Sequence, residues 1–333
     1  MIANEKYNNW LPLTVIRPSS QGKIIISNPL LRKRLAISIQ KIQEFFDDST
    51  PLKDNLSRYG LFKDEGLPSE WIQGFKEWNE KGWGLALPFY WISRGFPYHD
   101  KSPDPVYREE TLTRYLKMDG AIKTTKQFDS SFSLPSPQDL NDKISLGQVL
   151  LGRRTAHRFN SGADLQELSD WLWYGLYEVR ACRKPINGVI DILKSYGSAF
   201  DFYIVVYDVK DLESGIYFYN LVDHSLSLIQ KGAYRSNMVS ALMGQSPPET
   251  ACFSLLVTAE FKRYQWRYRH ERALRNLFTD SGRILQKMIL IANVFSMDCF
   301  LTPAIKDLEI NQLLKLDAKI EGSIYSLTVG KRL

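Results

Sequence analysis

A short basic stretch in the middle of the chain has the residue types that grip an anion. It follows the apolar segment 144–151 and opens with Gly152, which permits a tight backbone turn. Guanidinium groups can hold a phosphate through paired hydrogen bonds, and a hydroxyl can add another. The candidate ligand groups are Arg153, Arg154, Thr155 and His157. The pattern predicts an anion site, and the alternative is a basic helix end that only complements its own dipole.

A second arginine-rich segment, residues 263–275, contains a cation and a phenol side by side. Arg267 stays protonated, so it can position an anion but cannot act as a general base. Tyr268 carries a hydroxyl that can give or take a proton during catalysis. The dense positive charge suits a phosphate, a carboxylate or an acidic peptide. The alternative for Arg267 and Tyr268 is an exposed pair with no chemical role.

These two segments and a third one between them resemble, in order and spacing, parts of the nitroreductase-like flavoenzymes. Residues 153–159 resemble the Arg-Arg-Ser-x-Arg-x-Phe opening of that family. Residues 212–226 resemble the Gly-Leu-Tyr-x-Tyr … Asp-His-x-Leu segment of its SagB/McbC-type branch. Residues 266–282 resemble that branch's Trp-Lys-Tyr … Arg-Gly-Tyr-Arg … Glu-x-Gly block. The resemblance covers residues 144–330.

The resemblance implies an FMN-dependent dehydrogenase that oxidises thiazoline or oxazoline rings in peptide natural products. It implies a peptide or peptide-derived heterocycle as substrate, a homodimer with FMN at the subunit interface, and a complex with other biosynthetic enzymes. The implied catalytic pair is Arg267 and Tyr268, with arginine in place of the family's lysine. The residues implied to bind FMN are Arg153, Arg154, Thr155, His157, Ser195, Gly197 and Gly282.

Two other functions stay open. The family's Gly-Gly pair is missing around Ser195 and Gly197, and His157 stands where a permanent cation is usual. These differences, with the loss of the lysine, favour a flavin-free relative that serves as a scaffold or partner subunit. A generic flavin nitroreductase is the third reading, although it would need no Trp-x-Tyr block. Lys331 and Arg332 can reach an anion or remain solvated.

The composition is that of an ordinary globular protein, with 44% hydrophobic and 24% charged residues among 333. A net charge of +6 permits anionic partners, but no basic tail or zinc-finger spacing points to nucleic acid. The four histidines and three cysteines are dispersed, so no metal site is predicted and the thiols fit a reducing compartment. No signal peptide or membrane span is recognisable, and a cytoplasmic location is expected.

The first part of the chain predicts a small winged-helix-like module over residues 1–94. Apolar spacing indicates helices over 30–46, from Thr50-Pro51 onward and over 67–82, and alternation over 85–91 indicates a strand. The resemblance implies that such a module handles the substrate peptide, and a structural cap is the alternative. Residues 95–140, rich in Pro, Ser, Asp and Lys, form a predicted linker or extended arm that holds one helix near 107–115.

The remaining residues, 141–333, predict the FMN domain, because helical and strand patterns alternate there as in an α+β fold. The resemblance implies a nitroreductase-like mixed sheet wrapped by helices. The long segment 272–295 suits either a dimer interface or the core of a monomer. The predicted helices are 144–151, 165–179, 236–243, 272–295 and 309–316. The predicted strands are 201–209, 216–220, 225–228, 252–260, 298–301 and 323–329.

Overall fold

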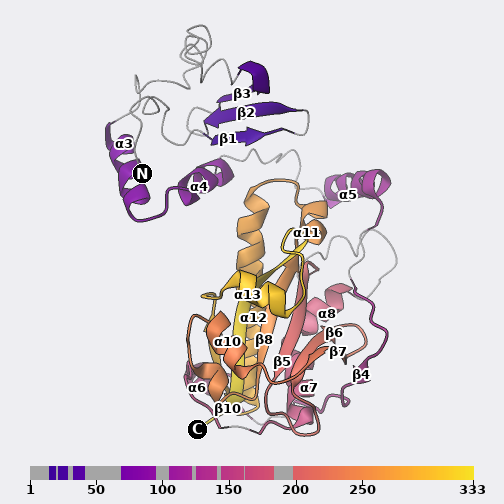
Figure 1. The fold of residues 1–333 in the computed structure, drawn as a ribbon. Coiled ribbons are helices and arrows are strands. Elements are labelled where there is room, and N and C mark those ends of the chain that lie inside the picture. The colour runs from indigo at the N-terminus through magenta and orange to yellow at the C-terminus, as the bar shows by residue number, and fades with distance from the viewer. Residues whose placement is uncertain are drawn as a thin grey trace. The chain divides into compact units, whose positions relative to one another are not determined.

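The computed structural model divides into two compact units, Met1–His99 and Asp100–Leu333 (Figure 1). The residues that the structure describes are 15–19, 22–28, 33–41, 69–94, 105–121, 125–140, 144–160, 162–183 and 198–333.

The first unit contains a three-stranded antiparallel sheet in the order β1-β2-β3, followed by two helices. Ile25 and Ile26 of β2 are buried, and β2 is the middle strand, which pairs with both β1 and β3. The aromatic ring of Trp78 contacts those of Trp83 and Tyr90, at centroid distances of 5.6 and 6.1 Å. The elements are β1 (Val15–Pro18), β2 (Lys23–Asn28), β3 (Lys33–Ser38), α3 (Ser69–Glu80) and α4 (Ala86–Arg94).

Two sequence predictions in this unit were wrong, and the winged-helix-like module is not confirmed. Residues 33–38 of the predicted helix 30–46 form strand β3, which pairs with β2. The predicted strand 85–91 lies mostly in helix α4. Short apolar runs fit either period, so the partner available in the fold decides between strand and helix. The helix over 67–82 is confirmed as α3, and the one predicted from Thr50-Pro51 lies outside the described residues.

The second unit is built on a seven-stranded sheet in the order β4-β7-β6-β5-β8-β10-β9. Neighbouring strands pair antiparallel, and parallel pairing occurs at isolated bridges such as Thr155 with Cys299. All six predicted strands are confirmed within a few residues. The strands are β4 (Phe132–Ser133), β5 (Phe200–Val206), β6 (Gly215–Asn220), β7 (Ser225–Lys231), β8 (Phe253–Glu260), β9 (Met297–Thr302) and β10 (Glu321–Lys331).

Helices cover both faces of this sheet, which confirms the α+β class. Side chains alternate along the fully buried β5: Phe202 and Ile204 enter one core with α7 and α12, and Tyr203 and Val205 enter another with α10 and α13. The predicted helices are confirmed, with 165–179 divided at Leu176 into two. The helices are α5 (Pro105–Asp119), α6 (Leu146–Gly152), α7 (Leu165–Gly175), α8 (Tyr177–Arg183), α10 (Arg235–Ala241), α11 (Phe261–Arg267), α12 (Arg272–Val294) and α13 (Asp307–Leu313), with a 3-10 turn at Pro247–Glu249.

Strand β4, within the segment 125–140, forms one edge of this sheet. Phe132 of β4 pairs with Leu226 of β7, and the Leu134 amide donates to the His224 carbonyl at 3.1 Å. The ring of Phe128 packs 4.8 Å from that of Phe218. This segment is therefore bound into the domain by backbone and side chains.

Candidate functional site

The basic turn predicted to bind an anion is fixed by backbone pairing to the ends of two strands. The Ala156 amide donates to the Cys299 carbonyl of β9 at 3.1 Å. Asn160 exchanges two hydrogen bonds of 3.0 Å with Lys331 at the end of β10. Phe159 packs closely on Gly330: a Cβ added at Gly330 would lie only 2.5 Å from the Cβ of Phe159. The fold therefore holds residues 153–160 in one conformation beside the last residues of β10.

Some charged groups around this turn already bind other groups of the protein. Arg154 donates to the Leu151 and Arg153 carbonyls at 2.8 and 3.0 Å, the helix-end role weighed above as the alternative. Lys331 pairs with Glu167, and Arg332 pairs with Asp298 at 3.1 Å.

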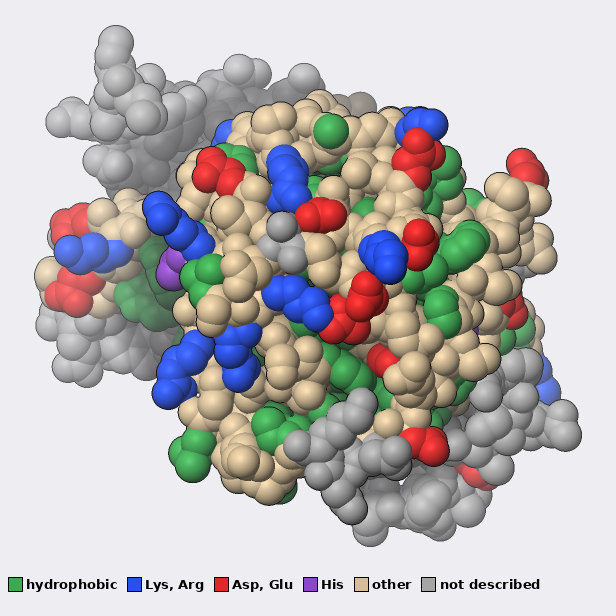
Figure 2. All heavy atoms as spheres, turned by 90° about the horizontal axis from the view of Figure 1, so that it is seen from below, with side chains coloured by type: hydrophobic (Ala, Val, Ile, Leu, Met, Phe, Trp, Pro, Cys, Tyr) green, Lys and Arg blue, Asp and Glu red, His purple; other side chains and the backbone are tan. Residues whose placement is uncertain are grey.

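Three groups of the turn remain available. Arg153 is half-buried and has no carboxylate partner within the described ranges, and the side chains of Thr155 and His157 are exposed. Figure 2 views this end of the domain, where α6 and the C-terminus lie, and shows Lys and Arg side chains with Asp and Glu side chains among them. Within the turn, Arg153 can attract an anion and Thr155 offers a hydroxyl to bind it.

The segment with the predicted catalytic pair forms the end of α11, a helix that sequence patterns did not predict. The Tyr268 amide caps it by donating to the Tyr264 carbonyl at 2.9 Å, and the two rings lie 4.7 Å apart. The Arg267 guanidinium carbon lies 5.3 Å from the centre of the Tyr268 ring. The Tyr264 hydroxyl donates to Asp280 of α12 at 2.8 Å. Arg267 and Tyr268 are thus adjacent and only partly buried, so they can meet a ligand.

Helix α5 packs against the same segment. The Trp266 indole donates to the Gly120 carbonyl at 3.1 Å, and the Arg269 guanidinium stacks 3.6 Å from the centre of the Tyr115 ring. Arg269 also forms an ion pair with Asp119. No sequence signal linked α5 to the arginine-rich segment, because these contacts join residues about 150 positions apart.

The two halves of the predicted site lie toward opposite ends of α12 (Figure 1). The amide of Asn293 donates to the Val149 carbonyl of α6 at 2.5 Å, which places the basic turn at the C-terminal end of α12. Tyr264 reaches Asp280, and the rise of an α-helix puts about 20 Å between Asp280 and Asn293. One chain therefore does not bring Arg153 and Tyr268 together.

The remaining predicted FMN ligands are glycines and a serine. Ser195 and Gly197 lie outside the described residues. Gly282 lies in the middle of α12, where an added Cβ would meet no atom of the described chain within 4 Å. Leu274 and Phe278, eight and four residues before Gly282, are 41% and 49% exposed on the same helical stripe. This stripe is exposed, and Gly282 leaves the α12 backbone accessible along it.

Gly282→Ala offers a test of this stripe. Alanine is favoured over glycine inside a helix by about 1 kcal/mol, and no described atom opposes the new methyl group. The variant is therefore expected to melt at a higher temperature than the wild-type protein in the absence of ligand. If a flavin or a second subunit approaches Gly282, the same variant binds FMN more weakly. Calorimetry and FMN titration measure the two effects, and unchanged FMN affinity would remove Gly282 from the site.

His224, in the third segment of the resemblance, has a structural role. Ser169 donates to the Pro135 carbonyl at 2.6 Å, so its oxygen accepts a hydrogen bond from His224 Nε2 at 2.7 Å. His224 Nδ1 then accepts from the Tyr219 hydroxyl at 2.7 Å. Burial, with the nearby Arg180 charge, lowers the pKa of His224 to about 4. The imidazole is neutral and fully bonded within the core.

Part of the chain matches a known protein family. The family described as "Nitroreductase family" matches residues 197–331. The chain carries a nitroreductase-family domain. A putative nitroreductase from Anabaena variabilis has the same fold, with a TM-score of 0.53 and 21% identity over 72% of this chain. The chain spans about half of that protein, 49% of its length.

Two curated relatives of this chain come from Rhizobium leguminosarum bv. trifolii. The trifolitoxin operon protein TfxC is 29% identical over 328 residues, which cover 91% of this chain and 88% of TfxC. The trifolitoxin-processing protein TfxB is 28% identical over 135 residues, 39% of this chain and 36% of TfxB. Within the described residues, no helix is long and apolar enough to cross a membrane, and no cluster of three or more His, Cys, Asp or Glu is arranged to hold a metal ion.

Proposed function

We propose that this nitroreductase-family protein is an FMN-dependent dehydrogenase that converts azoline rings to azoles in a peptide-derived natural product. Family membership supports an oxidoreductase. The match to TfxC over most of both chains supports a role in peptide maturation, because TfxC belongs to the operon of a toxin. The basic turn carries the proposal, since the fold holds it rigidly beside β9 and β10 while leaving Arg153 without a carboxylate partner among the described residues.

The residues of the turn fit the phosphate of FMN. Arg153 supplies a permanent charge, Thr155 a hydroxyl, and His157 a ring nitrogen. The backbone of this turn is held by hydrogen bonds to β9 and β10. A phosphate offers acceptor oxygens that match this set of donors. The open face at Gly282 admits a flat group or a second helix close to the α12 backbone.

A complete site requires two copies of the chain. Because the basic turn and Tyr268 lie toward opposite ends of α12, a mononucleotide held by Arg153 of one copy cannot reach Tyr268 of the same copy. An antiparallel pairing of two α12 helices would bring the turn of one copy beside Arg267 and Tyr268 of the other. The exposed Leu274 and Phe278 supply apolar surface for that pairing.

The chemistry divides between the cofactor and this chain. Bound FMN would supply the hydride-acceptor chemistry that oxidation of the azoline ring requires. In this proposal the Tyr268 hydroxyl takes part in removing the proton from the neighbouring ring atom. Arg267 keeps a fixed positive charge beside it, which orients a carbonyl or carboxylate of the peptide. The exposed Lys262 and Arg275 extend the positive surface and suit an acidic peptide.

The test is whether the purified chain retains FMN after desalting. The wild-type protein is expected to show a flavin absorption band and to elute as a homodimer. Arg153→Ala is expected to lose FMN affinity by about tenfold or more, because a charge-assisted contact to phosphate contributes about 1.5–3 kcal/mol. Arg158→Ala, on an exposed neighbour, serves as the matched control.

A flavin-free scaffold is the second candidate. The observation that favours it is the commitment of Arg154, Lys331 and Arg332 to groups of the protein itself. A colourless wild-type protein that takes up no added FMN would establish this candidate over the dehydrogenase. Turnover of simple nitroaromatics with NAD(P)H would instead favour a generic nitroreductase.

A further inference from the structure

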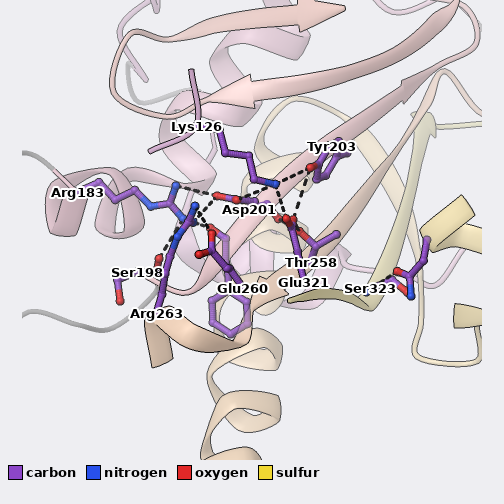
Figure 3. A network of polar contacts seen from close by, with 12 residues as sticks. Lys126, Arg183, Ser198, Asp201, Tyr203, Thr258, Glu260, Arg263, Glu321 and Ser323 are labelled. Atoms are coloured by element: carbon purple, nitrogen blue, oxygen red, sulfur yellow. Dashed lines mark hydrogen bonds and ion pairs between the residues drawn. The ribbon is translucent and has the colours of Figure 1, made fainter. Parts of the chain in front are cut away.

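Six charged side chains form a buried cluster beneath α11 (Figure 3). Asp201 of β5 is fully buried, and one of its oxygens accepts from Arg183 and Arg263 at 2.9 Å each. The second Arg263 nitrogen pairs with Glu260 at 2.7 Å. The members are Arg183 from α8, Asp201 from β5, Glu260 from β8, Arg263 from α11, Glu321 from β10 and Lys126 from the extended segment before β4.

Lys126 completes this cluster from outside the sheet. Its ammonium group lies 3.3 Å from the free oxygen of Asp201, pairs with Glu321, and donates to the Tyr203 hydroxyl at 2.7 Å. Figure 3 shows it entering opposite the two arginines. Three carboxylates then face three cations, so the buried charges balance. The lysine side chain is 24% exposed, whereas that of Asp201 is fully buried. A buried carboxylate without its partner is costly, so the segment and the cluster depend on each other.

The cluster fixes the first turn of the helix that ends in the proposed catalytic pair. Arg263, held by acids from β5 and β8, lies four residues before Arg267, and Tyr264 lies four residues before Tyr268. Residues four apart share one face of a helix, so the direction imposed on Arg263 sets the direction of Arg267. Burial would raise the pKa of Asp201, but the charges of Arg183, Arg263 and Lys126 outweigh it and hold that pKa below its usual value.

We propose that Lys126 is a positioning residue, which balances the buried cluster under α11 and thereby orients Arg267 and Tyr268. The catalytic meaning of this role rests on the proposed function, whereas the structural coupling does not. It assigns a specific role to the extended segment before β4: Lys126 closes the cluster on the side away from Arg183 and Arg263. The prediction is that changing one side chain at position 126 loosens residues 261–275, which are more than 130 positions away.

The experiment compares Lys126→Met, Lys126→Arg and Lys117→Met in the full chain. Lys117 is an exposed lysine of α5 and provides the matched control. Hydrogen exchange followed by mass spectrometry is expected to show about tenfold faster exchange in residues 261–275 of Lys126→Met. Residues 153–160 and the strands β6 and β7 should keep wild-type exchange. Lys126→Arg restores protection, and Lys117→Met leaves it unchanged.

A second measurement separates positioning from general stability. In the flavin-loaded protein, Lys126→Met is expected to bind FMN within about threefold of wild type. Reduction of the bound flavin by a synthetic thiazoline peptide should be slowed about tenfold. If the wild-type protein binds no FMN, the proposed function fails, but the exchange experiment still decides the coupling.

Three outcomes would overturn the proposal. One is wild-type exchange of residues 261–275 in a folded Lys126→Met protein. Another is a uniform rise in exchange over the whole domain, because this marks a residue that acts through global stability. The third is that neither Lys126→Met nor its replacement Lys126→Gln folds, because Lys126 would then contribute to stability alone.

Discussion

Replacing Tyr268 with phenylalanine is expected to lower azoline oxidation by about two to four orders of magnitude, the usual contribution of a positioned acid or base. The substitution removes one hydroxyl and leaves the ring, which packs 4.7 Å from the Tyr264 ring, in place. The fold and FMN binding should therefore be unchanged. The measurement is the initial rate of azole formation from a thiazoline peptide, read by mass spectrometry, together with an FMN titration.

Tyr234→Phe provides the matched control for this prediction. It makes the same chemical change at a hydroxyl that only weakly contacts the Lys231 carbonyl, at 3.4 Å, away from α11. We expect this control to retain wild-type turnover. Equal rates for Tyr268→Phe and the wild-type protein would remove Tyr268 from the mechanism.

Replacing Asp201 with asparagine is expected to cost about 3–5 kcal/mol of unfolding free energy at neutral pH, because it removes the carboxylate that Arg183 and Arg263 share and leaves Arg183 with no other carboxylate partner among the described residues. Both Arg183 and Arg263 have side chains that are 2% exposed, so water cannot replace the lost charge. Urea denaturation at several pH values measures the effect. Asp119→Asn is the control, since its ion pair with Arg269 is exposed and worth about 1 kcal/mol or less.

The pH dependence of this effect has a definite sign. The pKa of Asp201 is held below its usual value in the folded protein, because the neighbouring cations outweigh burial. The stabilisation is therefore fully present above the unfolded pKa of about 4 and is lost as the pH falls through the lower folded value. The gap between wild type and Asp201→Asn should be constant between about pH 6 and 8 and should narrow below about pH 4. A gap that widens in acid, or a cost below about 1 kcal/mol, would contradict this account.

Most elements of the nitroreductase-family domain could be predicted from the sequence. Strands such as 201–209 and 252–260 and the long helix 272–295 were predicted near their observed limits, because each buries side chains with a clear period over many residues. The order of the basic turn and the Trp-x-Tyr block was enough to identify the family. The N-terminal elements over 33–38 and 86–94 were assigned the wrong type, since their apolar runs are too short to distinguish two periods.

Which distant residues come into contact could be seen only in the folded structure. Lys126 and Asp201 are 75 positions apart and belong to segments with no shared pattern, yet their charges meet under α11. Helix α11 itself was not predicted, because it is seven residues long and is held by Asp201 and Glu260 through Arg263. The distance between the basic turn and Tyr268 likewise follows from the length of α12. The periodicity of a segment indicates which of its side chains are buried. Ion pairs between distant residues, and the distances between site residues, depend on how the segments pack in the folded chain.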